Sequence, residues 1–106
     1  MIEQTWGLRA EEVDGIRRVL AAHPAVDKAV VYGSRALGTH RAGSDIDITL
    51  IGQMPWSELN EIETDLDKLD LPYTIDLSLE SQIESQALRQ HIRKHGQQIY
   101  PATPDQ

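Results

Sequence analysis

The chain has 106 residues, enough for one compact domain and too few for two. Apolar residues make up 40% of it and charged residues 25%, a balance that excludes an intrinsically disordered chain. The net charge of −7 argues against polynucleotide binding by this chain alone, and the absence of cysteine excludes disulfides and thiolate metal sites, so any metal must have oxygen or imidazole ligands.

The first half of the chain predicts a helix followed by two strands. Residues 8–23 carry apolar side chains at helical spacing, and Pro24 ends that pattern. Residues 28–32 form a short β-branched run that stops at Gly33, which is typical of a buried strand leading into a turn. Residues 45–51 alternate polar and apolar side chains, which predicts a strand with one buried face.

The next segment predicts a second helix and a third strand. Ser57 is a plausible N-cap, and the apolar residues that follow it are spaced by three and four positions up to Leu69. Pro72 closes this helix. Residues 73–79 alternate again, with Asp76 on the polar face of the predicted strand.

The last segment predicts a third helix and a short final strand. Ser81 and Glu84 have the spacing of a capping box, and Gly96 follows a basic last turn as a terminator. Residues 98–100 predict one more short strand. These elements indicate an α/β (α+β) fold in which helices pack against a small mixed sheet. We expect a single domain over residues 1–100 and a frayed tail over residues 101–106.

Three aspartates on the predicted strands suggest a magnesium site. Asp45 and Asp47 are two residues apart, about 6.6 Å along a strand, and therefore share one face. Asp76 lies on the polar face of another strand, so the three carboxylates can converge. Such a cluster repels itself unless cations bind, and Mg²⁺ prefers carboxylate and phosphate oxygens. The alternative is that the Asp-x-Asp pair is only a solvated strand face, an N-cap or part of a turn.

A glycine and a serine follow the first predicted strand and suggest a phosphate cradle. Gly33 permits positive φ and close approach of a ligand, and Ser34 could open a helical turn whose backbone N–H groups bind an anion. A plain strand-to-helix turn is the alternative for this pair alone. Together with the acidic pair on the next strand, however, the turn would set a triphosphate beside its metal ligands.

These two motifs form one segment that resembles the signature of the DNA polymerase beta-like nucleotidyltransferases, here GSRALGTHRAGSDIDITL. The chain is most similar to the stand-alone minimal nucleotidyltransferases, which match it in length, in element order and in the late aspartate. The resemblance implies the nucleotidyltransferase fold and in-line transfer of a nucleoside monophosphate with release of pyrophosphate. Leu37 departs from the pattern, because many relatives carry arginine before the second glycine.

The resemblance also implies roles for individual residues. Asp45 and Asp47 would ligate two Mg²⁺ ions, and Asp76 would ligate the catalytic ion and help to deprotonate the acceptor hydroxyl. The implied nucleotide contacts are Gly33, Ser34, Arg35 and Ser44, with the β- and γ-phosphates held by the first two. For Arg35, an equal alternative is a side chain that faces solvent.

The histidines in and after the motif are less informative. His40 and its neighbour Arg41 could contact substrate, but we favour exposure to solvent. His91 and His95 are four residues apart on a predicted helix, a spacing that can bind a transition metal. The helix dipole is a sufficient reason for His95 in the last turn, and we expect no zinc.

The resemblance finally implies a partner, because the catalytic core leaves almost no chain to recognise an acceptor. Minimal nucleotidyltransferases resemble one half of a two-component system whose other half is a small all-helical protein, commonly of the HEPN type or a related substrate-binding family. The acceptor hydroxyl would belong to that partner or to a substrate that the partner holds. In some pairs the helical protein is a toxin that receives AMP from ATP on a tyrosine. The alternative is a non-catalytic nucleotide-binding antitoxin or regulatory subunit that acts by complex formation. Homo- or hetero-oligomers are both open.

The distribution of apolar residues along the chain bears on its localisation. The N-terminal residues lack the apolar stretch of a signal peptide, and no run of about 18 apolar residues occurs. We therefore expect a cytoplasmic protein with no membrane contact.

Overall fold

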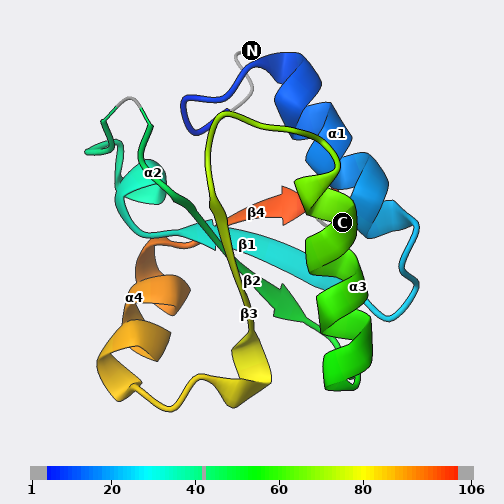
Figure 1. Ribbon diagram of the computed structural model, residues 1–106. Helices are drawn as coiled ribbons and strands as arrows, with labels where there is room; N and C mark the ends of the chain where they lie inside the picture. Colours follow the sequence, from blue (N-terminus) through cyan, green and yellow to red (C-terminus); the bar gives the residue numbers. More distant parts are fainter. Residues whose placement is uncertain (1–4, 42, 103–106) are drawn as a thin grey trace.

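The computed structural model describes residues 5–41 and 43–102 (Figure 1). Four α-helices, four strands and one short 3₁₀ helix alternate along this part of the chain. In chain order they are α1 (Ala10–Ala21), β1 (Lys28–Tyr32), α2 (Ser34–Leu37), β2 (Ile46–Ile51), α3 (Trp56–Asp67), β3 (Ile75–Leu79), η1 (Glu80–Gln82), α4 (Gln86–His95) and β4 (Gln97–Tyr100).

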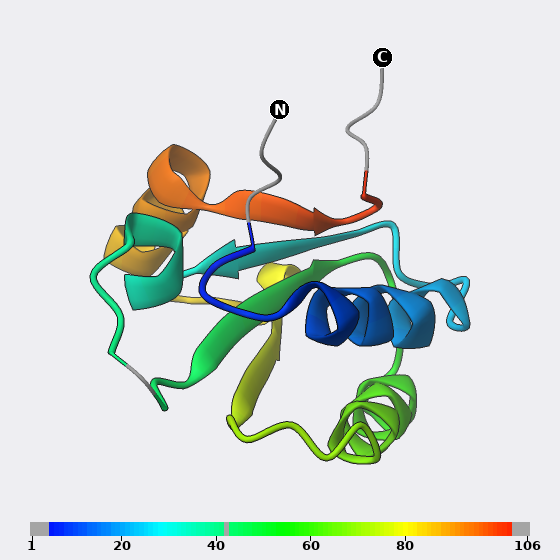
Figure 2. The same ribbon diagram turned by 90° about the horizontal axis from the view of Figure 1, so that it is seen from above.

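The strands form one mixed sheet in the order β3-β2-β1-β4, which confirms the predicted fold class. β1 runs antiparallel to both β2 and β4, whereas β2 and β3 are parallel. Figures 1 and 2 show α1 and α3 together on one side of the sheet and α4 on the other. The parallel β2–β3 connection runs through α3, so the two aspartate-bearing strands become neighbours.

The core lies between the sheet and the α1–α3 layer. The apolar residues Ile46, Ile48 and Leu50 of β2 are fully buried, as are Ile16 and Leu20 of α1. Because side chains alternate along a strand, their polar neighbours must project from the opposite face of the sheet. That face carries the candidate site.

Two predicted helix starts are wrong. Ser57 lies inside α3, whose N-cap is Pro55. The capping box at Ser81 and Glu84 does not form, because residues 80–82 adopt the 3₁₀ helix and α4 begins only at Gln86. The Ser85 hydroxyl accepts the Leu88 N–H at 3.1 Å and is the actual cap.

A tertiary contact holds the irregular turn before α4. The guanidinium of Arg89 donates to the carbonyl oxygens of Glu80 and Ile83, and it forms an ion pair with the Glu80 carboxylate at 2.9 Å. These bonds satisfy backbone groups that a longer helix would otherwise bond internally.

Most of the other predicted boundaries hold within two residues. The first helix and all four strands lie where the side-chain pattern placed them. The predicted tail falls mainly on residues 103–106, which lie outside the described residues. Within the described residues, every helix is too short or too polar to cross a bilayer.

Candidate active site

Asp47 and Asp76 are direct partners across the parallel β2–β3 pair. Parallel partners point to the same face, and neighbouring strands lie about 4.8 Å apart, so the two carboxylates project side by side from the face opposite the core. Asp45 immediately precedes β2, two residues before Asp47. Asp47 is half-buried, whereas Asp45 and Asp76 are exposed. The structure thus brings together the three predicted acids.

Charge repulsion acts on the central carboxylate of this group. Partial burial raises the pKa of Asp47 above its ordinary value, and the charges of Asp76 and Asp45 raise it further. His91 opposes these effects in part. A bound cation would relieve both the repulsion and the burial of charge, so the donor set suits a hard divalent ion.

The three carboxylates are not drawn tightly together. Among residues 5–41 and 43–102, the histidine and acidic side chains whose ligand atoms all lie within 4.8 Å of one another are instead His23, Glu58 and Glu61. Both ring nitrogens of His23 already contact carboxylates, Glu58 at 2.6 Å and Asp65 at 2.9 Å. We interpret that group as an ion-pair cluster joining the end of α1 to α3. Two cations about 3.5–4 Å apart could span the wider aspartate group.

The turn at Gly33 leaves room for the Asp47 carboxylate. The glycine has a φ of 79° and is the N-cap of α2. A Cβ atom on Gly33 would collide with the carboxylate of Asp47. Both the backbone conformation and the close approach therefore require glycine at this turn. Ser34 opens α2 next to it, as predicted, and is half-buried.

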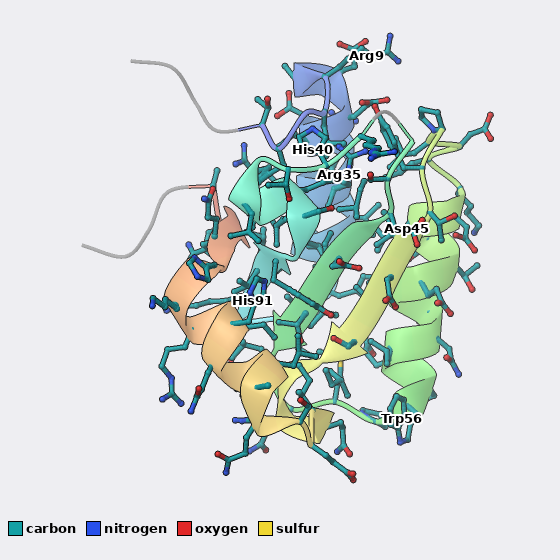
Figure 3. The ribbon with its side chains drawn as sticks, turned by 90° about the vertical axis from the view of Figure 1, so that its left-hand side faces the viewer. Arg9, Arg35, His40, Asp45, Trp56 and His91 are labelled. Carbon is teal, nitrogen blue, oxygen red and sulfur yellow. The ribbon has the colours of Figure 1, made fainter. Side chains whose placement is uncertain are left out.

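His91 is a site residue that the sequence reasoning missed. The backbone N–H of Gly33 donates to its Nε2 at 2.9 Å, and its ring makes an edge contact with Tyr32 at 6.3 Å between centroids. Figure 3 shows His91 between α4 and the strands. The sequence did contain a signal for this position. His91 follows Leu88 by three residues, which puts both side chains on the same face of the helix.

The side chain of Arg35 is buried and bonded to the backbone, whereas the sequence predicted a contact with phosphate or with solvent. Its side chain is only 2% exposed, so the solvent-facing alternative is wrong. The guanidinium donates to the carbonyl oxygen of Ser44 at 2.8 and 3.1 Å and to that of Trp6 at 2.8 Å, and it lies 4.6 Å from the ring centre of Tyr73. These contacts do not support a phosphate contact by Arg35.

The remaining loop residues divide between packing and solvent. The Ser44 hydroxyl accepts the Arg41 N–H at 2.9 Å and so closes the turn before β2. His40 is half-buried against Gly7, close to Arg35 (Figure 3), whereas Arg41 is exposed as expected. No described contact places either His40 or Arg41 at the aspartates.

Comparison with known proteins gives a family for most of the chain. The sequence model of the family described as "Polymerase beta, Nucleotidyltransferase" matches residues 14–105. No curated protein sequence matches the chain.

Two solved structures of similar fold come from complexes of a toxin with an antitoxin. A chain in a crystal structure of a toxin–antitoxin with AMP-PNP has 25% identity and a TM-score of 0.67, over 83% of this chain and 72% of that chain. A second match, at 21% identity and a TM-score of 0.64, comes from a complex of tri-AMPylated Shewanella oneidensis HEPN toxin with MNT antitoxin and covers 88% of this chain and 72% of that chain. The latter likeness is one of fold.

Proposed function

We propose that this chain, which belongs to the polymerase beta nucleotidyltransferase family and is a nucleotidyltransferase, transfers AMP from ATP to a hydroxyl group of a helical partner protein. The observation that carries the proposal is the pairing of Asp47 with Asp76 beside the Gly33 turn. In that arrangement the residues proposed to bind a chelated triphosphate and the carboxylate proposed to act on the acceptor would lie on one sheet face.

The acidic residues suit magnesium. Asp45, Asp47 and Asp76 would hold Mg²⁺, which when bound neutralises phosphate charge and polarises the phosphorus centre. The raised pKa of Asp47 supports this role, because a cluster of carboxylates that repel one another gains stability from a cation.

The protein groups position the reactants. Gly33 and Ser34 would hold the β- and γ-phosphates through backbone N–H groups and the serine hydroxyl. The acceptor oxygen then bonds to the α-phosphorus while the bond from that phosphorus to the bridging oxygen breaks, and pyrophosphate leaves. The exposed carboxylate of Asp76 would accept the proton of the acceptor hydroxyl.

The proposed partner comes from the solved structures of similar fold. One of the complexes described above contains a tri-AMPylated HEPN toxin and an MNT antitoxin. By analogy, this chain would modify a HEPN-type helical protein and so act as an antitoxin. Its own surface of net charge −7 is poorly suited to a polynucleotide acceptor.

Labelled ATP tests the proposal. The chain is incubated with Mg²⁺, ATP labelled at the α-phosphate and a purified HEPN-type helical protein, and label on that protein is measured. We expect transfer by the wild type, at least a hundredfold loss in Asp76→Asn, and no loss in Asp67→Asn, an exposed acid on α3. A complex that forms without any transfer of label would refute transfer and support the non-catalytic antitoxin instead.

A further inference from the structure

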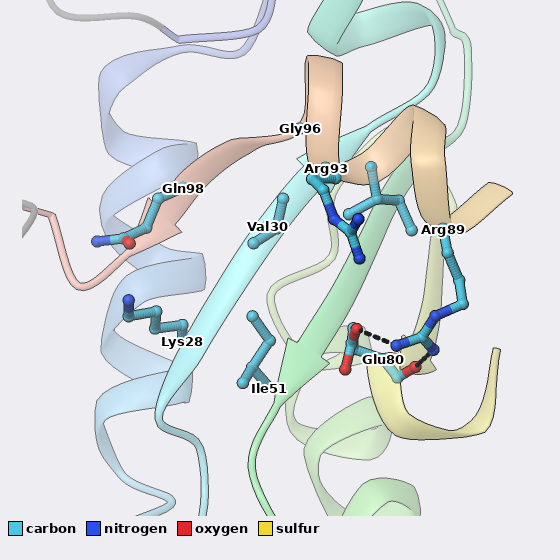
Figure 4. Close-up of a pocket in the computed structure, with 9 residues that line it drawn as sticks. Lys28, Val30, Ile51, Glu80, Arg89, Arg93, Gly96 and Gln98 are labelled. Atoms are coloured by element: carbon cyan, nitrogen blue, oxygen red, sulfur yellow. Dashed lines mark hydrogen bonds and ion pairs between the residues drawn. The ribbon is translucent and has the colours of Figure 1, made fainter. Parts of the chain in front are cut away.

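We propose that the cavity between α4 and the sheet docks an acidic segment of the acceptor protein that also presents an aliphatic side chain; this inference rests on the proposed function. The cavity has a volume of about 350 Å³ and lies beside β1, the 3₁₀ turn and α4 (Figure 4). That volume is sufficient for one or two side chains.

The cavity has an apolar floor. Val30 of β1, Ile51 of β2 and Ile92 of α4 line it and are each half-buried. No residue of α4 is fully buried, although the helix carries Leu88 and Ile92 on its inner side. The helix and the sheet therefore leave apolar surface between them that an aliphatic side chain could cover.

The rim of the cavity is positively charged in an acidic protein. Lys28, Arg89 and Arg93 line it together with one acid, Glu80. Arg89 pairs with Glu80, as the dashed lines in Figure 4 show. Within the described residues, Lys28 and Arg93 have no ion-pair partner, so their charges remain available to an anionic ligand.

The cavity lies on the same sheet face as the aspartates. Lys28, Val30 and Tyr32 alternate onto this face of β1, and Tyr32 is the cross-strand partner of Asp47. Lys28 and Tyr32 are four residue steps apart along the strand, or roughly 13 Å. A peptide segment anchored at the rim would therefore extend towards Asp47 and Asp76 along the sheet.

The lining favours a protein segment over a nucleic acid. Nucleic-acid sites generally combine cations with aromatic platforms on which bases stack, and none of the described residues that line this cavity is aromatic. The rest of the chain, with its net charge of −7, would repel a long polyanion. A few carboxylates beside an aliphatic side chain match both the rim and the floor.

The test uses a fluorescein-labelled synthetic peptide of glutamate, leucine and tyrosine, with binding to the intact chain followed by fluorescence anisotropy. We expect the double variant Lys28→Glu/Arg93→Glu to weaken binding at least tenfold. The matched control Lys68→Glu/Lys94→Glu makes the same change in charge outside the cavity lining and should remain within twofold of the wild type. A peptide with glutamine in place of glutamate should also bind at least tenfold more weakly.

The outcomes separate docking from transfer. Absence of peptide binding, equal losses in both double variants, or tighter binding of single-stranded oligothymidylate with the same dependence on Lys28 and Arg93 would each overturn the proposal. MgATP binding and transfer of label to the peptide tyrosine are measured in parallel. If the peptide binds as expected while the chain transfers no label to the helical partner protein, docking stands and the proposed transfer fails.

Discussion

The backbone N–H of Gly33 donates to Nε2 of His91 at 2.9 Å, across 58 positions of sequence. This bond ties α4 to the turn that leads from β1 into α2. It also occupies an N–H that the proposed phosphate site requires, because one donor cannot serve the imidazole and a phosphate oxygen equally well. Triphosphate binding at Gly33 therefore has to displace His91.

Replacing His91 with alanine should release the Gly33 N–H. We expect His91→Ala to bind MgATP roughly two- to tenfold more tightly, since a net hydrogen bond contributes about 0.5–1.5 kcal/mol. Isothermal titration calorimetry measures the affinity, and His95→Ala, a change at the adjacent exposed histidine, serves as the control. Weaker binding in His91→Ala would show that the imidazole contacts the nucleotide instead of competing with it.

Gly33→Ala should cost more than the same change at Gly38. Both glycines have positive φ, 79° and 78°, but only at Gly33 would the added Cβ strike Asp47, and nothing lies within 4 Å at Gly38. We expect Gly38→Ala to lower the free energy of unfolding by about 1 kcal/mol and Gly33→Ala by a further 1–2 kcal/mol or so. Urea denaturation measures both. Equal losses, with MgATP binding intact in each, would contradict the contact.

Removing the charge of Asp47 should not destabilise the metal-free protein. The pKa of Asp47 is raised in the folded state, so ionisation destabilises the fold as pH rises past its ordinary value of 3.8. At pH 7 without divalent ions, Asp47→Asn should be as stable as the wild type or more stable by about 1 kcal/mol. Its thermal shift with MgATP should disappear.

The exposed Asp14 of α1 provides a control for this substitution. Asp14→Asn should keep the full MgATP shift and the wild-type stability. An unchanged shift in Asp47→Asn would remove that residue from the proposed metal ligands.

Arg35 should act on stability and not on nucleotide affinity. Lysine cannot reproduce the forked bonds to Ser44 and Trp6, so Arg35→Lys should lower the free energy of unfolding by about 2–4 kcal/mol. Arg41→Lys, at an exposed position, should have no effect. MgATP affinity, measured where Arg35→Lys remains folded, should stay within twofold. A stable variant with strongly weakened binding would restore the phosphate role.

The His23 cluster should make stability depend on pH. Burial lowers the pKa of His23, but hydrogen bonds and charges from Glu58 and Asp65 outweigh it, and the pKa is raised above 6.5. The protonated ring thus stabilises the fold fully below pH 6.5, and this contribution is lost as pH rises through the raised value. His23→Gln should cost about 1–2 kcal/mol at pH 6 and clearly less at pH 9, by urea denaturation. A cost independent of pH would mean that the ring contributes by packing alone.

Local pattern alone was sufficient for much of the fold and for part of the site. Alternation is a property of neighbouring residues, so it placed β2 and β3 and set Asp45 and Asp47 on a polar strand face, and a β-branched run placed β1. The first residues of α3 and α4 were harder to predict, because more than one nearby side chain can cap a helix. Before α4, for example, both Ser81 and Ser85 are possible N-caps. The real start of α4 has the Ser85 cap and a contact between residues nine apart, Arg89 with Glu80, which the local side-chain pattern did not predict.

By itself, the sequence determined that a glycine-serine turn follows one strand and that three aspartates lie on the polar faces of two others. Tertiary structure decided that Asp76 stands beside Asp47, that His91 holds the Gly33 N–H and that Arg35 is buried. The reason is physical: strand register and helix placement are set by how the whole core packs, and no short stretch of chain contains that information.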